Sequence, residues 1–125
     1  MIRIGTCSWK YDSWKGLIYP DKDEFNFLSE YSKHFNTVEV DQWFWSLFEP
    51  KKAVLPKDSD VKLYAKSVKD DFKFTIKIPN SITLTHFYNK DKTAELKPNP
   101  FFLKTDLFEK FLETLKPMKK NIGVL

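Results

Sequence analysis

Apolar and polar residues alternate strictly in two short segments, 37–41 and 72–78. An alternation with a period of two is typical of an extended strand that has one buried face. Two further segments, 2–6 and 121–125, carry β-branched and other apolar residues over lengths that suit strands. The pattern therefore predicts four strands, the last of which ends the sequence.

Between these segments, apolar residues recur at the spacing of an amphipathic helix. They fall into three groups: Phe27, Leu28, Tyr31 and Phe35; Val61, Tyr64, Ala65 and Val68; and Leu107, Phe108, Phe111, Leu112 and Leu115. The predicted order is therefore β-α-β-α-β-α-β. Strands that alternate with helices predict a parallel sheet joined by crossover connections.

Two long connections interrupt this order, at 7–20 and at 79–100, and long loops in compact α/β units are often functional. The sequence also stops on a predicted strand, which leaves unpaired backbone groups at a sheet edge. We expect either that a partner covers this edge or that the chain is a fragment.

The composition indicates one globular domain of 125 residues, with 42% hydrophobic residues and 17% aromatic residues to build a core. The single cysteine, Cys7, excludes an internal disulfide and favours a reducing compartment. No apolar run is long enough for a signal peptide or a membrane span, so the sequence predicts a cytoplasmic protein without a membrane partner. The net charge of +4 comes from lysines mixed with acids, which indicates solvated helix faces more than a nucleic-acid surface.

Several blocks of residues, in the same order along the chain, resemble the YecE-like family, also called domain of unknown function 72. They are Ile4-Gly5-Thr6-Cys7-Ser8-Trp9, Trp14-Lys15-Gly16, Tyr19-Pro20, the run 35–41, the run 72–79 with Ile82-Thr83 and His86, and the weaker run 121–125. The resemblance implies a barrel similar to TIM-type barrels, for which no activity is settled. A full barrel needs about 250 residues. The expected fold is therefore an incomplete half-barrel of about four strands and three helices, in which 1–125 form a single truncated domain.

Strand alternation predicts which side chains share a face. On the second strand Glu39 and Asp41 lie together, and on the third strand Lys77 belongs to the polar set. In a β/α barrel the apolar faces meet the helices, and the active site lies at the carboxyl ends of the strands. Glu39 and Lys77 are therefore candidates for acid/base chemistry or for binding an anion, with Asp41 and His86 as further catalytic candidates. The competing interpretation, somewhat favoured over a functional pair, is an internal salt bridge between Glu39 and Lys77 that keeps two inward charges neutralised.

Aromatic residues crowd the connections that follow the first and second strands. Trp9, Trp14, Tyr19 and Trp45 are the candidates for ligand binding, because aromatic rings at a barrel mouth can stack flat ligands. A hydrophobic lid over the barrel is the alternative interpretation. Cys7 is expected to be a small buried residue rather than a nucleophile.

A metal site formed by Glu39, Asp41 and His86 has few ligands, so no metal is predicted, and no cofactor motif is present. The favoured function is binding of, or acid/base catalysis on, a small polar or anionic ligand at the rim of the strands. One alternative is a barrel that binds nucleic acid or phosphodiesters. The other is a non-functional fragment, or a half-barrel that requires a second half or a second copy of itself.

Overall fold

The computed structural model describes residues 1–49, 51–91 and 93–125. Three parallel strands form its main sheet: β1 (Thr37–Val40), β4 (Lys73–Ile76) and β5 (Ile122–Val124), in the order β1-β4-β5. The second, third and fourth predicted strands and their parallel pairing are thus confirmed, although each strand is shorter than predicted. The sequence pattern missed a small antiparallel pair, β2 (Leu47–Glu49) with β3 (Lys52–Ala53).

The three predicted helices are confirmed as α1 (Phe27–Tyr31), α2 (Asp58–Lys66) and α4 (Thr105–Thr114). The structure adds the short helix α3 (Asn80–Thr83) and three 3₁₀ helices, η1 (Asp12–Trp14), η2 (Gln42–Phe44) and η3 (Lys116–Asn121). The side chain of Asn26 caps α1 by accepting a hydrogen bond from the Ser29 N–H at 3.0 Å. No helix in the described part of the chain is both long and apolar enough to cross a bilayer.

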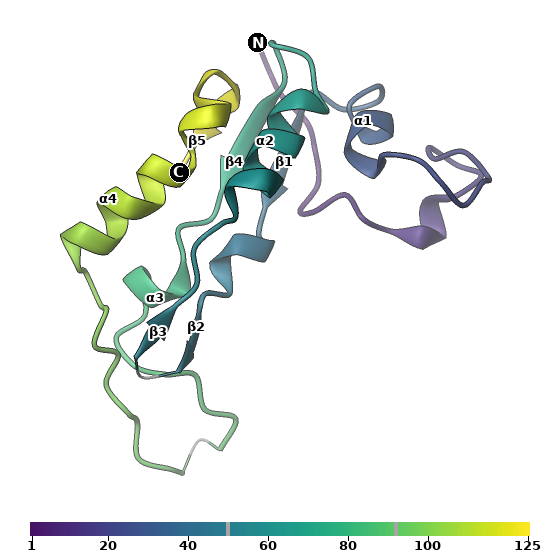
Figure 1. Cartoon of the computed structure of the whole chain (residues 1–125). Coiled ribbons are helices and arrows are strands. Elements are labelled where there is room, and N and C mark those ends of the chain that lie inside the picture. Colours follow the sequence, from purple (N-terminus) through teal and green to yellow (C-terminus); the bar gives the residue numbers. More distant parts are fainter. Residues whose placement is uncertain (50, 92) are drawn as a thin grey trace.

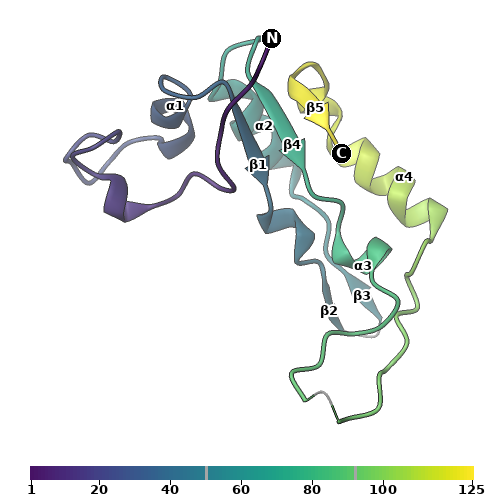
Figure 2. The ribbon, with the colours of Figure 1, turned by 180° about the vertical axis from the view of Figure 1, so that it is seen from behind.

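Helix α2 covers one face of the sheet. It lies in front of β1 and β4 in Figure 1 and behind them in Figure 2, which is turned by 180°. The side chains on the covered face are buried: Val38 and Val40 of β1, Phe74 and Ile76 of β4, and Val61 and Tyr64 of α2. The intervening residues of both strands are only partly buried, as the alternation in the sequence predicts. The face that is turned to the viewer in Figure 2 is therefore the polar face of the sheet.

The prediction of a first strand over 2–6 is wrong. Residues 2–6 form no regular strand, and a single parallel bridge to β1 follows them, between Cys7 and Glu39. Ile2 and Ile4, which were expected to face the helices, are 86% and 71% exposed. Because no apolar layer covers these two side chains, the segment lacks the burial that would hold it as a regular strand.

A cluster of buried, hydrogen-bonded polar groups connects the loop after β1 to the segment after β4. The Asn80 side-chain oxygen accepts hydrogen bonds from the backbone N–H groups of Ser46 and Leu47, both at 2.9 Å. The Ser46 hydroxyl donates to that of Ser81 at 2.6 Å, and the Asn99 amide donates to the Ser81 carbonyl at 2.9 Å. Buried backbone donors need such partners, so this cluster fixes how the two loops lie at the carboxyl ends of the strands.

Gly5 allows the first segment to approach β1 closely, and this contact generates a prediction. A Cβ atom at Gly5 would lie 2.0 Å from the Thr37 carbonyl oxygen, which is part of the backbone and cannot turn away. We expect Gly5→Ala to lower the free energy of unfolding in urea, followed by tryptophan fluorescence, by about 1–3 kcal/mol. Gly16→Asn is the control, because Gly16 has φ +76° and open space around it, and asparagine tolerates that conformation. Equal stability of Gly5→Ala and the unchanged chain would show that the close contact does not form.

Candidate functional site

The two charged residues singled out by the sequence, Glu39 and Lys77, meet on the polar face of the sheet. Glu39 pairs in register with Thr75, and the backbone N–H of Lys77 continues the ladder by donating to the Val40 carbonyl at 3.2 Å. The Lys77 Nζ lies 2.9 Å from the Glu39 Oε1, and the side chains are 48% and 32% exposed. The parallel strands therefore bring both groups to one rim, where a ligand from solvent can reach them.

Lys77 is held in its protonated form. Its hydrogen bond to Glu39, and then the charge of that carboxylate, raise the pKa of Lys77 above the usual lysine value. The Nζ also lies 5.9 Å from the centre of the Phe44 ring, in a cation–π arrangement. At neutral pH this group is a cation that can bind or stabilise negative charge, while a nearby carboxylate is the available base.

Cys7 adds a thiol to the same rim. Its Sγ lies 3.4 Å from the Asp41 Oδ2 and 3.8 Å from the Glu39 Oε1. The expectation that Cys7 is buried is wrong, because the thiol lies on the polar face and is exposed. Partial desolvation, the hydrogen bond to Asp41 and the two negative charges raise the pKa of the Cys7 thiol above its usual value. A raised pKa lowers the fraction of thiolate at neutral pH, and the thiolate is the nucleophilic form of the group.

Two hollows flank the ion pair and meet at Glu39 and Thr75. The smaller, of about 260 Å³, has mainly polar walls and is lined by Arg3, Gly5, Thr6, Cys7, Thr37, Val38, Glu39 and Thr75. The larger, of about 400 Å³, is mainly apolar and is lined by Glu39, Phe44, Thr75, Ile76, Lys77, Ile78, Thr83, Val124 and Leu125. We call them the polar hollow and the apolar hollow. Glu39 therefore stands at the boundary between two surfaces of different chemistry.

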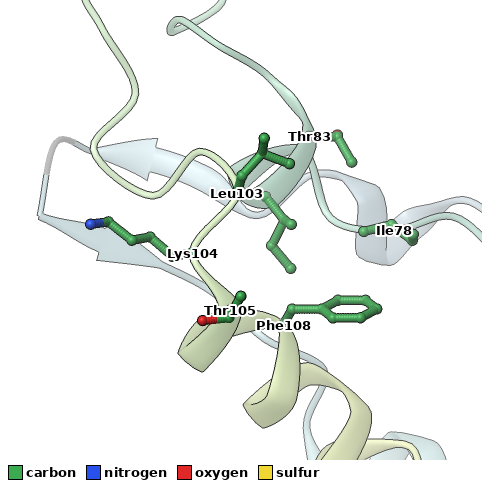
Figure 3. Close-up of a pocket in the computed structure, with 7 residues that line it drawn as sticks. Ile78, Thr83, Leu103, Lys104, Thr105 and Phe108 are labelled. Atoms are coloured by element: carbon green, nitrogen blue, oxygen red, sulfur yellow. The ribbon is translucent and has the colours of Figure 1, made fainter.

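A third hollow lies between α3 and α4 (Figure 3). Its volume is about 270 Å³, and its walls are almost entirely apolar, with Ile78 and Thr83 on one side and Phe108 of α4 on another. Lys104 is the only titratable side chain among its lining residues. It shares Ile78 and Thr83 with the apolar hollow, so it extends the apolar surface beside the site.

None of the four predicted aromatic ligand-binding residues lines either hollow beside the ion pair. Trp9 and Tyr19 are buried in the core, where the Tyr19 hydroxyl donates to the Trp9 carbonyl. Burial raises the pKa of Tyr19 to about 12. Trp14 is partly buried against Tyr19, with ring centres 5.9 Å apart. Trp45 is exposed and lies edge-on to Phe44, and it is Phe44 rather than Trp45 that approaches Lys77.

His86 does not line either hollow beside the ion pair. Its Nδ1 lies 2.9 Å from the Thr85 hydroxyl, and its backbone forms an isolated antiparallel bridge with Pro98. Within residues 1–49, 51–91 and 93–125, no group of three or more His, Cys, Asp and Glu side chains is arranged to hold a metal ion. The chemistry of the rim therefore rests on Glu39, Asp41 and Lys77.

Three contributors to this rim were not among the site residues that the sequence predicted. Phe44 and Thr75 line it directly, and Asn80 fixes the two loops that follow its strands. The alternation along the third strand does place Thr75 on the same face as Lys77. The partners of Asn80 are 33 and 34 residues away in sequence, so no local pattern signals its role.

Comparisons with known proteins match this chain to longer relatives. It is 29% identical over 123 residues to UPF0759 protein YecE from Escherichia coli K12 and, equally, to that from Escherichia coli O157:H7. The match covers 98% of this chain and 35% of each relative, so the chain spans about a third of the length of the curated relatives it matches. Two crystal structures of a DUF72 family protein from Enterococcus faecalis V583 share the fold, with TM-scores of 0.64 and 0.57 at 22% and 21% identity, over 98% of this chain and 37% of theirs.

The family described as "Protein of unknown function DUF72" matches residues 3–125, which is nearly the whole sequence. This match includes the segment 4–9, both alternating strands and the strand β5. The chain therefore belongs to the DUF72 family, in agreement with the resemblance of its sequence blocks to YecE-like proteins.

Proposed function

We propose that the rim around Glu39 and Lys77 binds a small polar or anionic ligand and can support acid/base catalysis on it. The ion pair carries this proposal, because it is solvent-accessible, lies at the carboxyl ends of parallel strands and stands between two hollows. In this arrangement Lys77 holds negative charge on the ligand, and the Glu39 or Asp41 carboxylate accepts a proton. Trp9, Tyr19 and His86 have no part in the proposal.

The alternative role is that of a structural salt bridge, which would add little to the stability of this chain. Exposed ion pairs typically stabilise a protein by only about 0–1 kcal/mol, because water screens the charges and the side chains lose freedom. The strand pairing and the apolar core on the α2 side hold β1 and β4 together without it. A cation and a carboxylate that contribute little to the stability of the fold can bind a ligand instead.

A nucleic-acid surface has less support. Several lysines pair with acidic neighbours, among them Lys33 with Glu30, Lys62 with Asp58, and Lys116 with Glu113. All three pairs are local contacts at a spacing of three or four residues, which favours solvated helix faces over a stripe that follows a phosphate backbone.

We also propose that these strands are one part of a larger TIM-type barrel, as an incomplete half-barrel formed by a single domain of residues 1–125. The spatial order of the Cys7 segment, β1, β4 and β5 supports this proposal, because the wall of such a barrel consists of neighbouring parallel segments. The match to only 37% of each longer chain of the same fold supports this proposal. The β5 edge and the exposed Val124 and Leu125 side chains would then be covered by further strands.

Variants of the ion pair test the ligand site, and they should shift affinity in opposite directions. We expect acetate and inorganic phosphate, titrated into the ¹⁵N-labelled 125-residue chain, to shift the amide signals of Glu39 and Lys77. Lys77→Met should weaken this binding about tenfold, because a charge-assisted hydrogen bond is lost. Glu39→Gln should tighten it, because the competing carboxylate is removed from Lys77.

The matched control for this experiment is Lys62→Met, which removes another exposed lysine from an ion pair on α2. It should leave the affinity for both anions unchanged. The ligand site is disproved if Lys62→Met and Lys77→Met weaken binding equally, or if neither anion shifts the amide signals of the rim.

The proton affinity of Cys7 tests whether the thiol faces the carboxylates. Desolvation and then Asp41 raise the pKa of Cys7, so Asp41→Asn should increase the fraction of thiolate at pH 8. We expect iodoacetamide to alkylate this variant faster at pH 8, because loss of the Asp41 charge and hydrogen bond lowers the pKa of the thiol. The rates should converge at a pH above both pKa values. Asp58→Asn on α2 is the control, and a rate unchanged by Asp41→Asn would separate the thiol from this carboxylate.

The open edge of the sheet predicts self-association when the chain is alone. A second copy can cover β5 and the apolar side chains beside it, and closed symmetric pairs are the commonest oligomers. We expect sedimentation equilibrium to give a mass above that of the monomer, which Val124→Lys lowers toward one chain. A monodisperse monomer that melts cooperatively would contradict pairing between copies.

A further inference from the structure

The polar hollow contains the only arginine of the sequence. Of the 21 lysine and arginine side chains, Arg3 alone is an arginine, and it lines the hollow that ends at Glu39. The side chain is partly buried, and its Nη1 donates to the Asn36 carbonyl at 3.1 Å. This contact anchors the guanidinium at the amino-terminal end of β1 and uses one of its five N–H donors.

The remaining donors of Arg3 are available to a ligand. Among the ion pairs within residues 1–49, 51–91 and 93–125, none involves Arg3. Thr37 and Thr75 line the same hollow and add hydroxyl groups. The hollow contains one carboxylate, that of Glu39, and Lys77 already neutralises it. Beside this ion pair, the walls offer the Arg3 guanidinium and several further hydrogen-bond donors.

We propose that Arg3 binds the carboxylate or phosphate group of an organic anion in the polar hollow, while the apolar body of that ligand lies in the apolar hollow beyond Lys77. This inference rests on the proposed ligand site and names the class of its ligand. A planar guanidinium presents paired donors that match the two oxygens of such a group, whereas a lysine offers only a point charge. Because the chain otherwise uses lysine, the arginine at this position indicates that paired donors are needed here.

The two hollows are placed so that one ligand can occupy both. Both hollows are lined by Glu39 and Thr75, which are direct neighbours across β1 and β4. This one pair of residues therefore forms the boundary between the two hollows. Beyond it, Ile78, Val124 and Leu125 give the second hollow its apolar wall. A ligand that crosses this boundary brings its central atoms next to the Glu39 carboxylate and the Lys77 ammonium, where proton transfer would take place.

Four small molecules separate the contributions of the anionic group and the apolar body. Hexanoate and hexyl phosphate carry both, acetate carries only the carboxylate, and hexan-1-ol carries only the chain. We expect hexanoate or hexyl phosphate to bind the ¹⁵N-labelled chain at least tenfold more tightly than either acetate or hexan-1-ol, with amide shifts in residues of both hollows. A preference for hexanoate or for hexyl phosphate distinguishes a carboxylate from a phosphate ligand.

Variants of Arg3 test its part separately from that of the ion pair. Arg3→Gln retains a donor for the Asn36 carbonyl and should weaken hexanoate binding about tenfold, with hexan-1-ol unaffected. Arg3→Lys should restore part of the affinity, because it retains the charge without the paired donors. Lys10→Gln, which lies outside both hollows, should change nothing.

The outcomes distinguish this inference from the proposed function. If Lys77→Met weakens hexanoate binding and Arg3→Gln does not, the ligand site stands and the role of Arg3 is disproved. If Arg3→Gln weakens binding and both Lys77→Met and Glu39→Gln leave it unchanged, the anion site stands without the ion pair. Binding of hexanoate no tighter than that of acetate, or amide shifts outside both hollows, would overturn the inference.

Discussion

The parallel register between β1 and β4 is the constraint on which the rest of the structure depends. Val38 pairs with Phe74 and Val40 with Ile76, and all four side chains are buried on the side that α2 covers. Because side chains alternate along a strand, this burial leaves Glu39 and its neighbours on the opposite face. A slip of one residue would bury the carboxylate and expose the apolar set. The hydrophobic core therefore determines where the charged groups of the candidate site lie.

A second, polar constraint acts just beyond the strands. Asn80 accepts from the backbone N–H groups of Ser46 and Leu47 while fully surrounded by protein, so the two loops can separate only by leaving these donors unpaired. Phe44 lies two residues before Ser46, and Lys77 lies three residues before Asn80. The position of the ammonium over the aromatic ring therefore depends on this side-chain amide as well as on the sheet.

The sequence could predict the elements that have a local pattern of apolar and polar residues. It failed where packing against distant parts of the chain determines whether a segment is buried. The alternation in 37–41 and 72–78 is sufficient to assign faces and to bring Glu39 and Lys77 together. The apolar residues of 2–6 suggest a strand as well, but Ile2 and Ile4 lack a layer to pack against. The aromatic residues of the first connection show the reverse case. Trp9 and Tyr19 look like exposed stacking residues, but they enter the core, where the Tyr19 hydroxyl finds the Trp9 carbonyl as its buried partner.

The strength of the Glu39–Lys77 interaction depends on what covers the polar face. In this chain water reaches both groups and screens their attraction. Further strands across the face would remove that water, so every charge at the rim would act more strongly on a bound ligand. Burial would also make an unpaired charge costly. When a proton moves to the Glu39 carboxylate, Lys77 loses its partner, so a buried site would favour a ligand that carries a negative charge beside Lys77. In the proposed barrel, the further strands that pair with the β5 edge would therefore also set the dielectric environment of the ion pair.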